Sequence, residues 1–115
     1  MMHYTQYIHY HVELLKEFNT AIHQQPPFRT PETLTEEDQR FQSVLNTLST
    51  MTRYSEHDNE QGQWLVGRVV STYFHLMPLL ARDLLWFFGG DCLHYMPDDE
   101  IDFYQQLDDQ KSLLS

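Results

Sequence analysis

Apolar residues recur every three or four positions along most of the chain, which is the period of an amphipathic helix. One long apolar stripe runs from Tyr4 to Gln24, and a second runs from Phe41 to Met51. Between Gln61 and Met77 two stripes lie side by side, as in a helix that contacts more than one neighbour. This spacing predicts three helices. At the tyrosine- and histidine-rich start of the first, a short strand is the alternative.

The densest apolar run lies between Pro78 and Phe88 and leaves no wholly polar face; its apolar members include Leu79, Leu80, Leu84, Leu85, Trp86 and Phe87. A helix that is apolar on all sides is usually buried by other helices. Proline favours the first turn of a helix, and Gly89-Gly90 can end one. We therefore expect a central helix over Pro78–Phe88. Its two charges, Arg82 and Asp83, are expected to face water or structural partners.

Three segments are rich in residues that interrupt helices. Positions 26–32 hold three prolines and predict an extended linker, with Phe28 anchored on the core. Positions 54–62 are polar and predict a mobile loop that includes His57 and Asp58. Positions 110–115 are expected to be a frayed tail.

Two shorter signals concern helix ends and helix packing. Thr33 and Glu36 fit a capping box at the start of the second helix. Gly67 lies inside the third helix, where glycine costs about 1 kcal/mol relative to alanine. Because a close approach of another helix would offset that cost, Gly67 predicts a tight helix crossing.

The C-terminal part combines a helix start with a surplus of acids. Pro97 followed by Asp98, Asp99 and Glu100 fits the first turn of a helix to about Leu107, since acids complement the positive end of the helix dipole. Capping does not explain the remaining acids: from Asp91 to Asp109 there are seven acids and no lysine or arginine. We predict that this surplus forms a partner-binding surface, joined by two surplus aromatic residues. The predicted binding residues are Asp98, Asp99, Glu100, Asp102, Asp108, Asp109, Trp64 and Tyr104.

The length of 115 residues suits one domain, and its core needs neither metal nor disulfide. The prediction is a single all-α domain over 1–115, a compact bundle of about four main helices plus a short helical turn. That turn is expected over Cys92–Met96, with Asp91 as its N-cap. The chain has one cysteine and no apolar run that could span a bilayer, and it opens without a secretory signal pattern. A cytoplasmic location is therefore expected.

The net charge of −10 indicates which partners are compatible with the surface. Nucleic acids and anionic membranes are repelled by such a surface, so direct binding to either is not expected. A protein partner with a basic surface is favoured, and the surplus aromatic residues also suggest a homodimer. The leading prediction is a small acidic adaptor or regulator that binds another protein. The alternative is an acidic inhibitor that mimics nucleic acid on a DNA- or RNA-binding protein.

The sequence offers little catalytic chemistry, and neither enzymatic activity nor a cofactor is expected. Asp91, Cys92 and His94 are weak candidates for a metal site, but the CxxC pair of structural zinc sites is absent. A helix N-terminus at Cys92 would lower the thiol pKa, whereas Asp91 would oppose that effect. A metal- or thiol-dependent enzyme that uses Cys92 with His94 as its base is the second alternative. The pattern leaves open whether His3, His9 or His11 binds metal.

Overall fold

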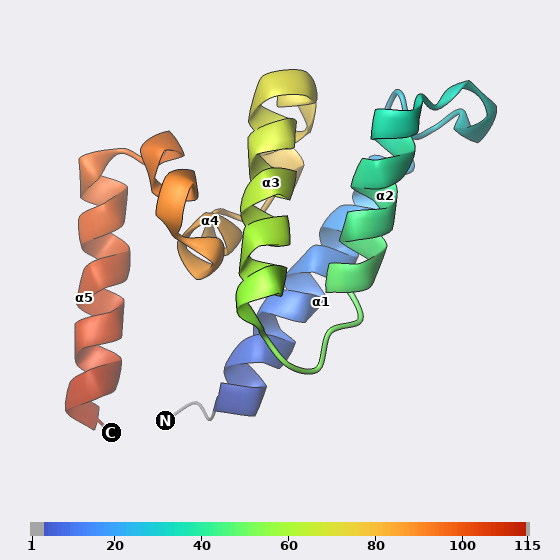
Figure 1. The fold of residues 1–115 in the computed structure, drawn as a ribbon. Coiled ribbons are helices and arrows are strands. Elements are labelled where there is room, and N and C mark those ends of the chain that lie inside the picture. Colours follow the sequence, from blue (N-terminus) through green and yellow to red (C-terminus); the bar gives the residue numbers. More distant parts are fainter. Residues whose placement is uncertain (1–3, 115) are drawn as a thin grey trace.

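The computed structural model describes residues 4–114, with side chains through residue 110 (Figure 1). This part of the chain contains α-helices and short 3₁₀ segments but no strand, so the predicted all-α fold is confirmed and the strand alternative at the start of the chain is wrong. The elements in order are α1 Tyr4–Ile22, η1 Pro31–Thr33, α2 Glu36–Leu48, α3 Glu56–Thr72, η2 Phe74–Leu79, α4 Arg82–Phe88, η3 Gly90–Tyr95 and α5 Asp98–Leu114.

Helices α1, α2 and α3 pack together and form what we call the body of the molecule, and α4 packs against it. Helix α2 packs against α1 and α3, and α4 contacts both α1 and α3. Segment η3 returns to α3, and α5 lies at the edge of the molecule beside α4, on the side away from α2 (Figure 1). Within residues 4–114, no helix is both long enough and apolar enough to cross a membrane.

The core follows the apolar stripes of the sequence. Helix α1 buries residues at three- and four-residue spacing, which are Ile8, His11, Val12, Leu15, Phe18 and Ile22. Phe28 is 1% exposed, so its predicted anchoring is confirmed. Its ring lies 5.3 Å from the ring of Phe41 and 5.2 Å from that of Tyr73, which joins the linker to α2 and to the end of α3.

The linker itself differs from the prediction. Instead of an extended segment, positions 26–32 form turns that lead into η1, and the Pro26–Pro27 peptide is cis. The Pro26 carbonyl oxygen lies 2.6 Å from His75 Nε2, so this linker is tied to η2 across the fold. Local proline rules could not show this, because the contact joins residues that are 49 positions apart.

Helices α2 and α3 each begin with a capping box, and neither box lies where the sequence predicted the helix to start. Helix α2 is capped by Thr35 and Asp38 rather than by Thr33 and Glu36. Helix α3 is capped by Ser55, whose hydroxyl accepts a hydrogen bond from the Asp58 N–H at 3.1 Å, and begins at Glu56. The predicted mobile loop at 54–62 is therefore wrong, because most of that range is the first two turns of α3.

The predicted central helix is correct in position but wrong in extent. Helix α3 ends at Thr72, and Pro78 lies inside η2 instead of starting a helix. Helix α4 begins only at Arg82 and ends at Phe88, with four buried side chains, which are Leu84, Leu85, Phe87 and Phe88. Gly89 ends α4 as predicted, and its φ of 62° and ψ of −149° form a conformation that only glycine adopts readily. Gly89 is also the N-cap of η3, so the assignment of Asp91 to that position is wrong.

The close approach at a glycine occurs in α3, but not at Gly67. A methyl group at Gly67 would meet only the Tyr95 hydroxyl oxygen, at 3.9 Å, so the predicted tight crossing there is wrong. At Gly62 the ring of Phe88 occupies the space that a methyl group would need. Glycine at position 62 is therefore what lets α4 approach α3.

The C-terminal helix was predicted to reach Leu107 or a little beyond. Helix α5 starts at Asp98, after Pro97, and continues to Leu114 rather than ending near Leu107. Positions 110–114, where the sequence predicts a frayed tail, are helical in the structure, and Ser115 lies outside the described residues.

Candidate functional site

The acids at the start of α5 have the arrangement expected of a first helical turn. The Pro97 carbonyl accepts hydrogen bonds from the N–H groups of Glu100 and Ile101, both at 3.0 Å. The Asp99 carboxylate accepts a bond from the Glu100 N–H at 3.0 Å, while the side chains of Asp98 and Asp99 remain exposed. The sequence therefore identified the start of this helix correctly.

One face of α5 is docked on α4, and we call it the inner face. Glu100 Oε1 lies 2.9 Å from Arg82 Nε, and the Tyr104 hydroxyl donates to Asp83 Oδ1 at 2.7 Å. A third bond runs from Trp86 Nε1 to Asp108 Oδ2 at 2.9 Å. The ring of Tyr104 also stacks on Trp86, with centroids 5.7 Å apart and planes at 18°.

Asp83 is the centre of this docking contact. Its carboxylate accepts hydrogen bonds from Tyr104 on α5 and from Tyr10 on α1, both at 2.7 Å. Burial is the largest influence and would raise the pKa of Asp83, but the two hydrogen bonds, the nearby His11 and a backbone hydrogen bond together hold that pKa below its usual value. Burial and the bond to Asp83 raise the pKa of Tyr104. A charged Asp83 thus joins three helices.

The opposite face of α5 is exposed and acidic, and we call it the outer face: Asp98, Asp99, Asp102, Phe103 and Asp109. All five side chains are exposed, including Phe103 at 57%. Asp109 accepts a bond from Gln105 Nε2 at 3.1 Å within the same helix. The predicted binding residues are thus divided: Glu100, Tyr104 and Asp108 hold α5 on the body, and the other four acids point outward.

Trp64, the remaining predicted binding residue, lies in the third turn of α3 rather than at a helix start. It is half-buried, and the Arg40 guanidinium carbon lies 4.4 Å from its ring centroid. This cation–π contact joins α2 to α3 across the surface. Because α2 lies on the side of the body away from α5 (Figure 1), Trp64 does not extend the outer face.

The residues proposed for metal or thiol chemistry do not assemble into a site. Cys92 is fully buried, whereas Asp91 and His94 are exposed. Burial and the nearby Asp91 raise the pKa of the Cys92 thiol to about 11, which is opposite to the shift that a reactive thiol needs. No group of three or more metal-ligating side chains occurs among the described residues.

The N-terminal histidines are also separated. His11 is buried and stacks on Phe87 with ring centroids 4.2 Å apart, while His9 is exposed with its Nε2 3.9 Å from Glu13 Oε1. His3 lies outside the described residues. The helical backbone thus directs His9 and His11 into different surroundings.

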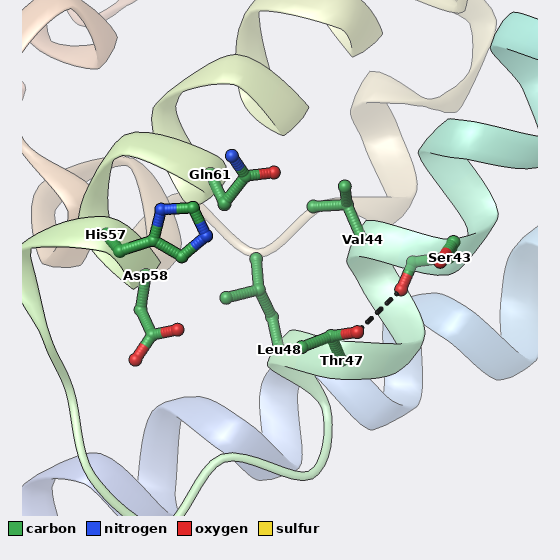
Figure 2. Close-up of a pocket in the computed structure, with 7 residues that line it drawn as sticks. All are labelled: Ser43, Val44, Thr47, Leu48, His57, Asp58 and Gln61. Atoms are coloured by element: carbon green, nitrogen blue, oxygen red, sulfur yellow. Dashed lines mark hydrogen bonds between the residues drawn. The ribbon is translucent and has the colours of Figure 1, made fainter.

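Sequence reasoning missed a small pocket between α2 and α3 (Figure 2). Its volume is about 140 Å³, and it is lined by Ser43, Val44, Thr47, Leu48, His57, Asp58 and Gln61. In Figure 2 the His57 ring lies across this space from the α2 side chains, and the Thr47 hydroxyl donates to the Ser43 carbonyl at 3.0 Å. Cofactor pockets usually exceed about 300 Å³, so this one has room for little more than a side chain. The Ser55–Asp58 capping pair was the signal that could have placed His57 on a helix.

Comparison with known proteins identifies a family without assigning an activity. No curated protein and no solved structure matched the chain. A family model described as PA2817-like matches residues 3–114, which is nearly the whole chain. The protein therefore belongs to the PA2817-like family.

Proposed function

We propose that this protein is a cytoplasmic adaptor or regulator that binds a protein with a basic surface through the outer face of α5. The observation that carries the proposal is the exposure of Phe103, 57%, beside the exposed carboxylates of the outer face. A large exposed aromatic side chain next to polar and charged groups is a common composition of a protein interface. Phe103 would therefore act as the apolar anchor of the interface.

The spacing of the outer face suits a partner that lies along the helix. Asp98, Asp102 and Asp109 follow the four- and seven-residue spacing of one stripe, and Asp99 and Phe103 lie one turn apart on the next. With a rise of about 1.5 Å per residue, the acids extend over about 16 Å. A partner that presents lysine or arginine can pair with the acids and place an aliphatic stem or a cation on the Phe103 ring.

The two alternative functions, a nucleic-acid mimic and a Cys92-dependent enzyme, agree less well with the structure. A mimic of nucleic acid uses carboxylates in place of phosphates, and an exposed phenyl ring has no counterpart in a phosphate backbone. An enzyme that depends on Cys92 would need an accessible thiolate, whereas this thiol is buried and its pKa is raised to about 11. Both observations favour the binding module.

The test is capture of partners from a lysate of the source cells at low and moderate salt, followed by mass spectrometry. The first variant is Phe103→Ala, and the second carries Asp98→Asn, Asp99→Asn, Asp102→Asn and Asp109→Asn together. A matched control, Glu36→Gln with Glu37→Gln, neutralises exposed acids at the start of α2 instead. Because all these side chains are exposed, the fold is expected to be kept. The four-acid variant and the control should lose a similar, small amount of stability, because each loses two acids from the first turn of a helix.

A basic protein that the wild type captures at low salt should be lost from both outer-face variants and kept by the control. Loss of a central aromatic anchor should weaken binding about 30-fold, or about 2 kcal/mol. Equal capture by wild type and both variants would refute the proposal. Displacement of the captured partner by added DNA or RNA would instead favour the nucleic-acid mimic.

A further inference from the structure

Helix α5 is attached to the body differently from the other helices. Helices α1 to α4 each contribute fully buried apolar side chains to the core. At positions 98–110, the part of α5 whose side chains are described, no residue is fully buried, and Ile101, Tyr104 and Leu107 are only partly covered. Figure 1 shows α5 at the edge of the molecule, beside α4. Elements with few buried contacts open most readily, so α5 is the element that can leave the body at least cost.

The connection to α5 is a suitable hinge. Met96 is 5% exposed and has extended backbone, with φ of −114° and ψ of 130°, so it is anchored in the core. Pro97 is exposed and has no N–H, so it makes no backbone bond back to η3. The Met96 N–H bonds within η3, and the Pro97 carbonyl bonds within the start of α5. Rotation between these two residues therefore leaves both of these backbone hydrogen bonds intact.

Three side chains of α4 hold α5, and each makes a different kind of contact. Arg82 binds a carboxylate, Asp83 binds a phenol hydroxyl, and Trp86 offers both a ring for stacking and an N–H for a second carboxylate. On α5 these groups lie at positions 100, 104 and 108, so a ligand must present them at successive four-residue intervals along one helix face. A second copy of this chain presents that same face.

We propose that α5 is an exchangeable arm, and that the α4 surface of one copy binds the inner face of α5 from a second copy, giving a dimer by reciprocal exchange. Each site in the dimer contains the same contacts as in the single chain, which makes such an exchange inexpensive. The outer face of α5 remains exposed in both forms. The dimer would present two outer faces, but its existence does not depend on the function proposed above.

A pair of charge-reversed variants isolates the exchanged form. Arg82→Glu places like charges at the α4–α5 contact of one chain, and Glu100→Arg does so in another. In each variant alone, both the closed monomer and an exchanged homodimer carry the repulsive pair. In a mixture, only reciprocal exchange between the two variants removes the repulsion. One site then joins the two substituted side chains, which have opposite charges, and the other site restores the original pair of Arg82 with Glu100.

The two full-length variants are unfolded in urea, mixed in equal amounts and refolded together, and the masses are measured by light scattering and native mass spectrometry. Co-refolding removes the kinetic barrier to exchange. The mixture is expected to contain about tenfold more species at twice the 13.8 kDa chain mass than either variant refolded alone, because two pairs change from repulsive to attractive. The double variant Arg82→Glu/Glu100→Arg restores an attractive pair within one chain, so it should form as little dimer as wild type does under the same conditions.

A heterodimer that is no more abundant than the homodimers of the separate variants would overturn the proposal. Hydrogen exchange on the wild-type protein gives a second test that does not depend on how the variants fold. Amides of α5 should exchange about 100-fold faster than those of α3 if the arm detaches while the body stays folded. Equal protection of α5 and α3 would mean that the arm opens only when the whole protein unfolds, and would overturn the proposal.

Discussion

Two glycines of α3 provide a matched pair for testing the packing of the body. At Gly62 an added methyl group would overlap the ring of Phe88, which is 2% exposed and enclosed by the core. At Gly67 the nearest atom is the Tyr95 hydroxyl oxygen at 3.9 Å, which is ordinary van der Waals contact. Both glycines lie inside the helix, so replacement by alanine gains about 1 kcal/mol of helix propensity at each. The two positions therefore differ only in how closely neighbouring side chains approach them.

At Gly62 the steric cost exceeds this gain. Overpacking of a core costs about 1–3 kcal/mol, and an enclosed ring places Gly62→Ala at the upper end, so the net loss should be about 2 kcal/mol. Gly67→Ala should raise the free energy of unfolding by up to about 1 kcal/mol. For a chain of this size the corresponding changes in melting temperature are a fall of about 8–10 °C and a rise of a few degrees.

Urea unfolding followed by circular dichroism measures both changes, with unchanged slopes as the check that the transition is comparable. A further variant, Gly62→Ala with Phe88→Leu, tests the cause. The smaller side chain should relieve the overlap, so the two substitutions should cost less together than the sum of their separate effects. If Gly62→Ala is as stable as wild type, or if Gly67→Ala is the more damaging change, the placement of α4 against Gly62 is wrong.

Two further predictions concern groups with shifted pKa values. The carboxylate of Asp38 is stabilised by hydrogen bonds from Tyr73 and Thr35, which outweigh burial and lower its pKa. A group whose folded pKa is lowered contributes stability above its unfolded pKa and loses it as the pH falls through the folded value. Asp38→Asn should therefore cost about 1–2 kcal/mol near pH 6, and urea unfolding should show this difference shrinking below about pH 4; a constant difference would contradict the assignment. Because Cys92 is fully buried and its thiol pKa is about 11, iodoacetamide at pH 8 should leave the folded protein unmodified and add one group per chain in urea. Equal labelling rates in both states, read by mass spectrometry, would contradict this burial.

The helix stripes could be predicted because periodic burial is a local property of the sequence. Helix α1 was expected to end at Gln24 and ends at Ile22. The start of α2 was missed because Thr33 with Glu36 and Thr35 with Asp38 fit the same local rule. A contact distant in sequence distinguishes them: Asp38 is also the acceptor for the Tyr73 hydroxyl, 35 residues away, and no local pattern contains that information.

The region around Pro78 shows a second limit of prediction from sequence, which concerns the path of the backbone. A dense apolar run predicts burial, and the buried positions at Leu80, Leu84 and Leu85 agree with it. It does not predict one continuous helix, because a 3₁₀ segment, an extended step and a short helix can bury the same side chains. The chain takes this broken path, with η2 ending at Leu79 and α4 starting at Arg82.

For the candidate site, the sequence indicated the surplus of acids but not how the helix divides them. The signal was present in the spacing, since Glu100, Tyr104 and Asp108 recur every four residues on one side of α5. Their partners on α4 were not predictable, because Arg82, Asp83 and Trp86 meet α5 only when the chain folds back through η3. The role of the outer face in partner binding stays a prediction.

The division of acids between the two faces of α5 links both proposals. An inner face made of leucines would have fixed the helix in the core, as the apolar stripes do for α1 and α3. Here the inner contacts are hydrogen bonds, one ion pair, the stack of Tyr104 on Trp86 and apolar side chains that are only partly buried. Water can replace the polar contacts at modest cost. Specificity is retained because three unlike groups must align, while attachment stays weak. Helix α5 is bound specifically but weakly through its inner face. It can therefore move from the α4 surface of its own chain to that of a second copy, while its acidic outer face with Phe103 stays exposed.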